Sequence, residues 1–282
     1  MSERSFVGYV ALVTGGTGGM APAIGAELAR RGVSTVVFAQ RGEAAAACAA
    51  CVAANPACAA VSMALDLSSR AAVRAFVDSL AARVGGRLDF LVNCSGACPR
   101  TAVDDVGEDE MASTLAVNAT GPFWLAQACR PLMWAAAAER ARADPGGPLG
   151  GGDAAVLNIG SLAGEDGAFA ASIAYTMAKA ALRGMTMQLA KNGFPPEAAA
   201  AGAGAPRSAF PLIRCNAIAP GPVRTAMLDD MAPADLAKIT SATLTDRITT
   251  VPEVARAAAY LLLDATNVTG QTLQLRGGVI RR

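Results

Sequence analysis

The amino-acid sequence predicts an α/β protein built as a doubly wound domain, in which a seven-stranded parallel sheet has helices on both faces. Three observations predict this class. Short β-branched runs alternate with longer Ala- and Leu-rich segments, the short runs are apolar without alternation, and the first of them leads into a glycine-rich turn. No shift in composition marks an internal boundary, so we expect a single domain over residues 1–282.

The strand candidates are short and rich in Val, Ile and Leu. They are Tyr9–Thr14, Thr35–Ala39, Val61–Leu65, Phe90–Asn93, Ala155–Ile159, Arg214–Ile218 and Thr272–Leu275. Apolar strands of this kind suit a sheet that is buried on both faces. Helices are expected in the segments between them: Ala21–Arg31, Glu43–Ala54, Ser69–Val84, Glu108–Ala119, Phe123–Arg142, Ser172–Lys191 and Pro252–Leu263.

Two segments rich in Ala, Gly and Pro interrupt this alternation, near residues 144–152 and 193–211. Each lies between a predicted helix and a predicted strand, and glycine and proline disfavour regular structure. We interpret both as loop insertions on the surface. Binding of a partner by these loops is the alternative.

Composition excludes several kinds of chemistry. The chain has no histidine, which rules out Ser-His-Asp and Cys-His catalysis and metal sites with imidazole ligands. A proton donor near neutral pH must then be Tyr, Lys, Cys or a carboxylate with a shifted pKa. The net charge of +1 without a basic block argues against nucleic acid as a partner, and no apolar run is long enough to span a membrane.

Seven cysteines, at positions 48, 51, 58, 94, 98, 129 and 215, lie mostly among alanines. Cys48, Cys51 and Cys58 could suggest a metal or redox site. Because neither a histidine nor a second CxxC pair accompanies them, we favour thiols in the core and expect no metal site. The N-terminus lacks the apolar run of a signal peptide, so we expect reduced thiols and a cytoplasmic protein, with an organelle matrix as the alternative.

The first predicted strand runs into Thr14-Gly-Gly-Thr-Gly-Gly-Met-Ala21 and then into a helix. Glycines in this context allow a tight turn and a close backbone approach to a pyrophosphate, which the helix N-terminus attracts. The spacing fits either Gly16-x-Gly18-x-x-Ala21 or Thr14-Gly15-x-x-x-Gly19-x-Ala21. We predict a dinucleotide site in a Rossmann-type fold, with a merely glycine-rich turn as the alternative.

The end of the second strand, Phe38-Ala39-Gln40-Arg41, bears on the choice of cofactor. It offers no acid to accept hydrogen bonds from a ribose 2′-OH, whereas the Arg41 guanidinium can pair with a 2′-phosphate. The sequence therefore predicts NADP(H). An ordinary solvated Arg41 is the alternative.

Tyr175 and Lys179 occupy positions i and i+4 of a predicted helix, so their functional ends can converge. The lysine ammonium and the positive charge of an oxidised nicotinamide favour the phenolate, which predicts a lowered pKa for Tyr175. This phenol can then serve as acid or base in place of histidine. Ser161 follows a strand, and its hydroxyl could hold a carbonyl oxygen. Taken alone, a Tyr-x-x-x-Lys spacing also fits a purely structural helix.

Further motifs follow in order along the chain: Asp66-Leu67, Asn93-Cys-Ser-Gly96, Val117-Asn118-Ala-Thr-Gly121, Asn216-Ala-Ile-Ala-Pro220-Gly221-Pro-Val223-Arg-Thr225, and Thr269-Gly270-Gln271 running to Gly277-Gly278. With the glycine-rich turn and the Tyr-Lys pair, they make the chain resemble the short-chain dehydrogenase/reductase family over essentially its whole length. Within that family, Thr225-Ala-Met227 and Pro252-Glu-Val254 are most similar to bacterial 3-oxoacyl-[acyl-carrier-protein] reductases.

The resemblance implies a role for each matching residue. Tyr175 would donate the proton, Ser161 would polarise the carbonyl, and Lys179 would bind the nicotinamide ribose and tune Tyr175. Asn118 would kink its helix and hold a water that links Lys179 to solvent. The implied cofactor-binding residues are Gly15, Thr17, Gly19, Met20, Arg41, Asp66, Leu67, Asn93, Gly96, Tyr175, Lys179, Pro220, Gly221, Val223 and Thr225.

The chain also departs from the family pattern. Cys94 replaces the second Asn of Asn-Asn-Ala-Gly, and Arg276 stands where an acid often precedes the final two glycines. The spacing from Ser161 to Tyr175 is about one residue longer than usual, which leaves Ser172 as an alternative serine.

The resemblance implies NADPH-dependent reduction of a carbonyl, with a 3-oxoacyl thioester as the expected substrate. A general alcohol or ketone dehydrogenase and a non-catalytic dinucleotide-binding scaffold or sensor remain alternatives. Docking to an acyl carrier protein stays open, because both insertions lie beside helix ends where carrier-protein reductases present basic docking residues. A homotetramer or homodimer is implied, paired through Phe123–Arg142, Ser172–Lys191 and the last strand.

Overall fold

The fold is seen in a computed structural model that describes residues 5–143, 153–168, 171–193, 212–225, 228 and 233–278. The predicted insertions near 144–152 and 193–211 lie outside these residues, apart from Gly193. Within the described part, seven strands form one parallel sheet in the order β3-β2-β1-β4-β5-β6-β7. The strands are β1 (Val10–Thr14), β2 (Thr35–Gln40), β3 (Ala59–Ala64), β4 (Phe90–Asn93), β5 (Asp153–Ile159), β6 (Leu212–Pro220) and β7 (Thr272–Leu275).

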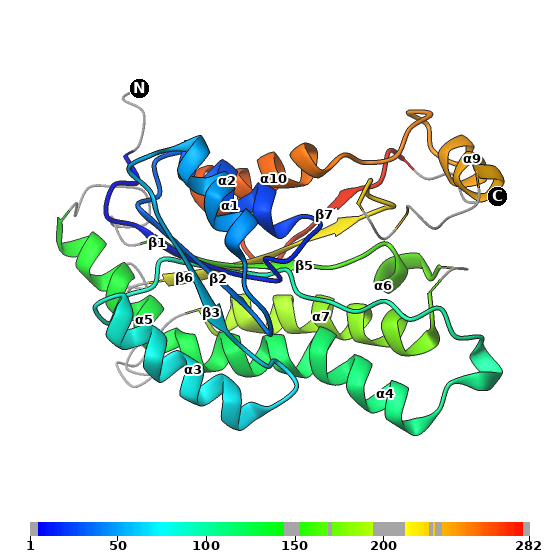
Figure 1. The fold of residues 1–282 in the computed structure, drawn as a ribbon, viewed down its shortest axis with the longest axis horizontal. Helices are drawn as coiled ribbons and strands as arrows, with labels where there is room; N and C mark the ends of the chain where they lie inside the picture. Colours follow the sequence, from blue (N-terminus) through cyan, green and yellow to red (C-terminus); the bar gives the residue numbers. More distant parts are fainter. Residues whose placement is uncertain are drawn as a thin grey trace.

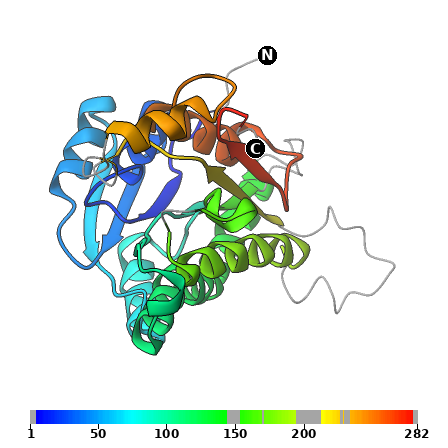
Figure 2. The same cartoon turned by 90° about the vertical axis from the view of Figure 1, so that its right-hand side faces the viewer.

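Helices cover both faces of this sheet, which confirms the predicted doubly wound class (Figure 1). One layer contains α1 (Ala21–Arg30), α2 (Ala45–Ala54) and α10 (Val251–Ala259). The opposite layer contains α3 (Arg70–Arg83), α4 (Glu108–Leu115), α5 (Gly121–Ala143) and α7 (Ile173–Lys191). The short α6 (Ala163–Asp166) and α9 (Pro233–Ser241) lie near the carboxyl edge of the sheet, which faces the viewer in Figure 2.

Each face of the sheet has its own apolar core, because successive strand residues point to opposite faces. Val13 and Phe38 point into the core under α1 and α2, whereas their neighbours Leu12 and Val37 point into the core under α3 and α5. The central strands are therefore buried on both sides, as their continuous apolar sequence indicates.

Several element boundaries differ from the prediction. Strand β3 begins at Ala59, two residues before the predicted start, because Ala59 and Ala60 pair with β2 despite the weak strand preference of alanine. Strand β6 is longer at both ends because it pairs with β5 from Leu212 onward and with β7 as far as Pro220. Ser69 and Ser172 cap their helices and do not begin them, since each hydroxyl accepts a hydrogen bond from a first-turn N–H.

Two π-helical turns replace stretches that we predicted as α-helix. One, Ala116–Thr120, joins α4 directly to α5, and the other, Tyr260–Asp264, follows α10. A π-turn accommodates one extra residue and often occurs at functional sites. The first of them contains Asn118.

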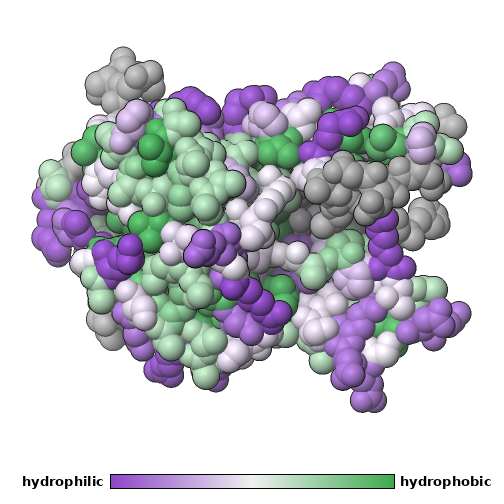
Figure 3. All heavy atoms as spheres, viewed as in Figure 1, coloured by the Kyte–Doolittle hydropathy of each residue, from purple (hydrophilic) through white to green (hydrophobic). Residues whose placement is uncertain are grey.

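Apolar and acidic side chains gather on different parts of the surface. On the face shown in Figure 3, the outer side of α2 is apolar, and acidic side chains gather over the start of α4 and the short 3-10 turn Val103–Asp105 before it. The exposed residues of α2 are Ala45, Ala46, Ala49, Val52 and Ala53. Among the helices that the structure describes, none combines the length and apolarity needed to cross a bilayer.

Candidate active site

The strand order changes direction between β1 and β4, so the two halves of the sheet diverge at this point. Ligands of doubly wound proteins bind at such a switch point, outside the carboxyl ends of the strands. Most of the predicted site residues lie at this edge, because they end or follow β1, β4, β5 and β6 or lie in the first half of α7. The others are Arg41 after β2, Asp66 and Leu67 after β3, and Asn118 in the first π-turn.

Tyr175 and Ser161 are neighbours at this edge. The Ser161 hydroxyl lies close enough to the Tyr175 phenol to lower its pKa, and the Ser161 Oγ accepts a hydrogen bond from the Ala163 N–H at 3.1 Å. The alternative serine, Ser172, is fully buried, and its hydroxyl caps α7 by accepting a hydrogen bond from Ala174 N at 3.1 Å. The hydroxyl that reaches Tyr175 is therefore that of Ser161.

Lys179 lies one turn after Tyr175 on α7 and is 6% exposed. Its Nζ donates a hydrogen bond to the Ile159 carbonyl at 2.9 Å and lies 5.6 Å from the centre of the Tyr175 ring. Burial lowers the pKa of this ammonium to about 8. The lysine therefore remains mostly charged at neutral pH, and β5 holds its position through the Ile159 carbonyl.

Our prediction of a lowered pKa for Tyr175 included the positive charge of an oxidised nicotinamide; in the protein alone the pKa of this phenol is raised. Burial raises its pKa to about 12, and the hydrogen bond to Ser161 and the proximity of the Cys98 thiol are smaller influences of opposite sign. The prediction counted charges and omitted desolvation, which disfavours the phenolate in a buried position. Without a bound cofactor, the phenol is protonated throughout the neutral range.

Asn118 is fully buried within the first π-turn. Its Nδ2 donates hydrogen bonds to Ala97 O at 2.9 Å and Thr114 O at 3.0 Å, and its Oδ1 accepts one from Ala97 N at 3.2 Å. A Cβ on Gly96 would lie 2.7 Å from this Oδ1 and 3.5 Å from the Lys179 Nζ. Glycine is therefore required at position 96 for Asn118 to approach the segment that follows β4.

The glycine-rich turn after β1 fits a bound pyrophosphate. Gly15 and Gly19 have φ of +89° and +65°, which side chains other than glycine rarely adopt, and no atom lies within 4 Å of a Cβ built on Gly18. The N-terminal turn of α1 has no side-chain cap and no acidic residue. Its N–H groups are thus free to bind an anion. Thr17 is exposed beside Gly18, and Met20 is half-buried.

Arg41 is exposed at the end of β2 and already has partners. Its Nη2 donates hydrogen bonds to the Asp66 carboxylate at 2.9 Å and to the Ser68 hydroxyl at 3.1 Å. Hydrogen bonds from Ser68 and Arg41 lower the pKa of Asp66 to about 2. The adjacent Gln40 is buried, and its side-chain amide has no hydrogen-bond partner among the described residues.

Some of the other predicted cofactor residues have structural roles, and others line the carboxyl edge of the sheet. Leu67 is buried, and Asn93 donates a hydrogen bond from Nδ2 to Asn158 Oδ1 at 2.8 Å, which ties β4 to β5. The segment from Pro220 to Thr225 lies over the same edge. A Cβ on Gly19 would be 3.8 Å from the Thr225 methyl group, so this segment lies beside the glycine-rich turn.

Backbone contacts fix the start of the segment after β6. Pro220 O accepts a hydrogen bond from Leu162 N at 2.8 Å, and Gly221 N donates one to Leu275 O at 2.8 Å. Val223 forms an isolated bridge with Thr249. The residues after Ser161, the end of β6 and the end of β7 are thus joined at one place.

Sequence reasoning missed two contributors to the site. Helix α6, which follows Ser161, is a single turn and too short for periodicity to reveal. Cys98 entered only as one of seven cysteines, yet its thiol affects the pKa of Tyr175, a relation that depends on tertiary structure. Within the described residues, no group of three or more Cys, Asp or Glu side chains is arranged to hold a metal ion.

Family models, related sequences and solved structures all point to the same protein family. A family model described as short chain dehydrogenase matches residues 9–235, and one described as Enoyl-(Acyl carrier protein) reductase matches residues 203–280. The chain is 28% identical to the Bacillus subtilis protein named uncharacterized oxidoreductase YmfI, over 95% of this chain and 97% of that protein. It is 27% identical to the 3-oxoacyl-[acyl-carrier-protein] reductase FabG of Salmonella typhimurium, over 98% of each chain.

Solved structures agree. The NAD+-bound form of a xylitol dehydrogenase matches with a TM-score of 0.77 at 25% identity, over 98% of this chain and 100% of that one. The family predicted from the ordered motifs is confirmed. The chain therefore belongs to the short-chain dehydrogenase/reductase family, whose members are oxidoreductases that bind a nicotinamide dinucleotide.

Proposed function

We propose that this protein is an NADPH-dependent reductase that converts a 3-oxoacyl thioester to the 3-hydroxyacyl thioester, with Tyr175 as proton donor. The observation that carries the proposal is the Tyr175 phenol, which lies beside Ser161 and, with its pKa raised to about 12 by burial, keeps its proton at neutral pH. A donor for reduction must hold its proton until negative charge develops on the substrate oxygen, and this phenol does so.

The residues of the site divide the chemistry as follows. The reduced nicotinamide, when bound, supplies the hydride. The Ser161 and Tyr175 hydroxyls donate hydrogen bonds to the substrate carbonyl oxygen, which draws electron density from the carbonyl carbon. As the oxygen gains negative charge, the Tyr175 Oη proton moves to it, and the Ser161 hydroxyl and Lys179 ammonium stabilise the phenolate that remains.

The residues around the first βα turn support NADP(H) as the cofactor. The N-terminus of α1 and the turn from Gly15 to Met20 would hold the pyrophosphate. Arg41 would pair with the 2′-phosphate, for which it must share or exchange its present partners Asp66 and Ser68. No acid stands at the end of β2 to repel that phosphate. Lys179 would bind the nicotinamide ribose, and Pro220, Gly221, Val223 and Thr225 would cover the nicotinamide.

The substrate class is supported by the relatives named as 3-oxoacyl-[acyl-carrier-protein] reductases. Either an acyl carrier protein or a smaller thiol could carry the acyl group.

A homotetramer or homodimer is proposed because the outer side of α7 exposes Ile173, Met177 and Met187 beside the small Gly184. All seven cysteines are unpaired, which supports a reducing compartment such as the cytoplasm.

A substrate panel tests the proposal. Purified protein is assayed for NADPH consumption with acetoacetyl thioesters of coenzyme A and of acyl carrier protein, simple ketones, sugars, steroids and quinones, and each substrate is repeated with NADH. We expect turnover of at least one thioester and a higher kcat/KM with NADPH. Loss of most activity in Tyr175→Phe, with cofactor binding retained, would assign the proton donor.

Two other outcomes would replace the proposal. Preference for NAD+ and a polyol would favour an alcohol dehydrogenase, an alternative supported by the similarity to the NAD+-bound xylitol dehydrogenase. Cofactor binding by calorimetry without turnover of any substrate would favour a non-catalytic sensor or scaffold.

A further inference from the structure

Two consecutive acids at the end of α6 form ion pairs with arginines from two different elements. Glu165 pairs with Arg183 of α7 at 3.5 Å, and Asp166 pairs with Arg276, the residue that follows β7. The acids are largely shielded from solvent, with side-chain exposures of 11% and 18%. Helix α6 is therefore attached by charge to both α7 and the end of the sheet.

This attachment matters because α6 directly follows Ser161. Gly164 lies against the backbone of α7: a Cβ there would be 2.5 Å from the Lys179 carbonyl carbon and 2.7 Å from Ala180 N. A single helical turn has little stability of its own. The position of the Ser161 hydroxyl relative to Tyr175 thus depends on the contacts that hold α6 in place.

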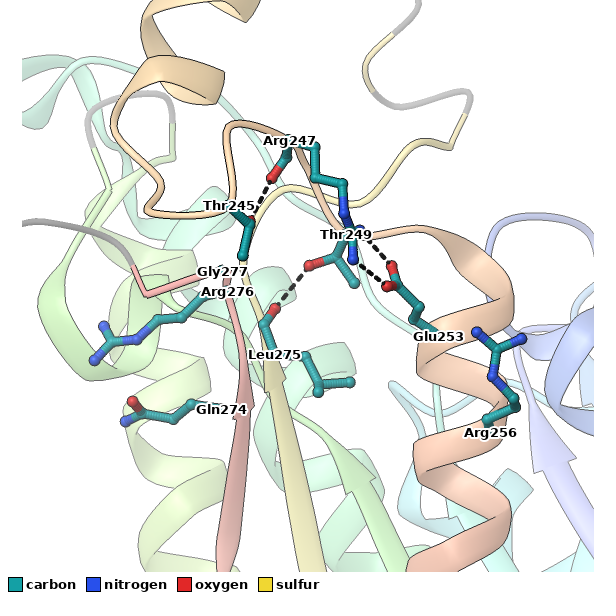
Figure 4. Close-up of a pocket in the computed structure, with 9 residues that line it drawn as sticks. All are labelled: Thr245, Arg247, Thr249, Glu253, Arg256, Gln274, Leu275, Arg276 and Gly277. Carbon is teal, nitrogen blue, oxygen red and sulfur yellow. Dashed lines mark hydrogen bonds and ion pairs between the residues drawn. The ribbon is translucent and has the colours of Figure 1, made fainter.

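Arg276 is anchored at both ends. Its Cα and Cβ pack on Gly221, since a Cβ at Gly221 would lie 3.2 and 3.1 Å from them, and the preceding Leu275 O accepts hydrogen bonds from Gly221 N and Thr249 Oγ1. Arg276 borders a cavity of about 370 Å³ near α10. Figure 4 shows its side chain pointing away from Thr249 and Glu253, on the other side of β7.

The positive charge of Arg276 is complementary to the negative charge of Asp166. Arg276 is 20% exposed and Asp166 is 18% exposed, so solvent screens this pair less than an exposed one. An acid at position 276, which the family resemblance leads one to expect, would repel Asp166. The pair therefore requires these two residue types together.

We propose that Arg276 is a positioning residue, which holds Asp166 and thereby keeps α6 and the Ser161 hydroxyl within hydrogen-bonding reach of Tyr175. This inference rests on the proposed role of Tyr175 as proton donor. Removing the ion pair frees α6 from β7, and the hydroxyl of Ser161 leaves its place beside the phenol.

The first test compares three changes with a matched control. Arg276→Gln keeps the Cα and Cβ that pack on Gly221 and removes only the charge, and Asp166→Asn removes the partner charge. The double variant Arg276→Asp with Asp166→Arg restores the pair in reverse. Arg256→Gln is the control, because Arg256 borders the same cavity from α10, is exposed and has no partner among the described residues.

We expect kcat for the carbonyl substrate to fall about 10- to 100-fold in both single variants, since a displacement of about 1 Å at an active site costs up to that much. The KM for NADPH should change less than about twofold, because the cofactor contacts remain. The reversed pair should regain most of the activity. Unchanged kcat in Arg276→Gln, an equal loss in Arg256→Gln, or no recovery in the reversed pair would overturn the proposal.

A second readout does not need turnover. The chain has three tyrosines, so incorporation of 3-fluorotyrosine gives three fluorine resonances, and Tyr175→Phe identifies that of Tyr175. We expect Arg276→Gln to shift this resonance at neutral pH, because Ser161 moves away from the phenol, and Arg256→Gln to leave it unchanged. An unshifted resonance in Arg276→Gln would contradict the positioning role. If the wild-type protein reduces no carbonyl, the proposed function fails while the position of this resonance still decides the role of Arg276.

Discussion

At the scale of single residues, burial sets the protonation of the two central side chains. Tyr175 and Lys179 both shift toward their neutral forms, with pKa values of about 12 and about 8. At neutral pH the phenol still carries its proton and the lysine most of its charge. A protein without histidine can thus keep its proton donor loaded over the physiological range.

The alkaline side of the pH profile should therefore belong to Lys179. We expect kcat/KM for carbonyl reduction to fall as pH rises through about 8, because the free enzyme loses the Lys179 proton there while Tyr175, with a pKa of about 12, stays protonated. Initial rates between pH 6 and 10 at low substrate concentration measure this. In Lys179→Arg, whose guanidinium stays charged, the decline near pH 8 should disappear, and its persistence would show that another group titrates.

Arg41 carries the prediction on cofactor preference. Arg41→Ala should raise the KM for NADPH about 10- to 100-fold, since each charge-assisted hydrogen bond contributes about 1.5–3 kcal/mol. The KM for NADH should stay nearly constant, because that cofactor has no 2′-phosphate. Steady-state kinetics with both cofactors measure the ratio, and Arg74→Ala, at an exposed position of α3, serves as control. Equal changes for the two cofactors would remove Arg41 from the phosphate site.

At the scale of elements, the contact between α6 and α7 has little tolerance for added atoms. Gly164→Ala should lower the free energy of unfolding by about 1–3 kcal/mol and reduce kcat, because its Cβ meets backbone atoms that cannot move aside. Urea unfolding and kcat measure the two effects. Gly107→Ala should leave kcat unchanged, since Gly107 has negative φ and no atom within 4 Å of the added Cβ. A fully active Gly164→Ala would mean that α6 can shift without consequence.

Long elements were predictable and short ones were not. The seven strands and seven main helices could be predicted from apolar runs and from the glycine and serine residues at their ends. The observed ends differ from the predicted ones by a few residues, because strand pairing or helix capping determines them. Helix α6 has four residues, fewer than periodicity needs, and the π-turn at Ala116–Thr120 has no distinctive pattern. Both lie in the candidate site, so the finer geometry of that site was the least predictable part of the fold.

At the scale of the whole molecule, the C-terminal elements close onto the first βα unit. Helix α10 packs against α1, and Arg31 pairs with Asp264 at 2.7 Å. Arg214 of β6 is 1% exposed, and its guanidinium donates hydrogen bonds to the carbonyls of Leu261 and Leu262 at 2.8 Å. This buried charge holds the second π-turn to the sheet.

Arg214→Met should therefore lower the free energy of unfolding by about 3 kcal/mol or more, because each buried carbonyl left without a donor costs about 1–3 kcal/mol. Chemical denaturation measures the loss. Arg256→Met, an exposed change on α10, should stay within about 0.5 kcal/mol of the wild type. An equally small effect at Arg214 would show that the apolar side chain replaces the guanidinium without penalty.

The apolar outer side of α7 leads to a prediction about assembly. We expect light scattering after gel filtration to give a multiple of the 28.3 kDa chain mass. Met177→Glu should reduce that mass, since Met177 is 46% exposed on this side and a buried charge would oppose pairing. Ala75→Glu, at an exposed position of α3 outside the expected pairing segments, is the control. A monomeric wild-type protein would exclude the proposed oligomer.

The composition of the candidate site was predictable from sequence, because Tyr175, Lys179, Asn118 and Ser161 lie in ordered motifs. The electrostatics of this site could not be predicted from the sequence. The raised pKa of Tyr175 depends on burial, and the pair of Asp166 with Arg276 joins residues 110 positions apart. Spacing along a chain carries no information on either.

The unpaired thiols have a practical consequence. Burial raises the pKa of all seven cysteines, to about 12 for Cys51, Cys94, Cys129 and Cys215. Since the thiolate is the reactive form, maleimides and oxidants should act slowly on the native protein near pH 7. A cysteine placed at an exposed position would ionise more readily than any of them. The wild-type chain is thus already a background suited to attaching a single fluorophore or spin probe, without prior removal of its own cysteines.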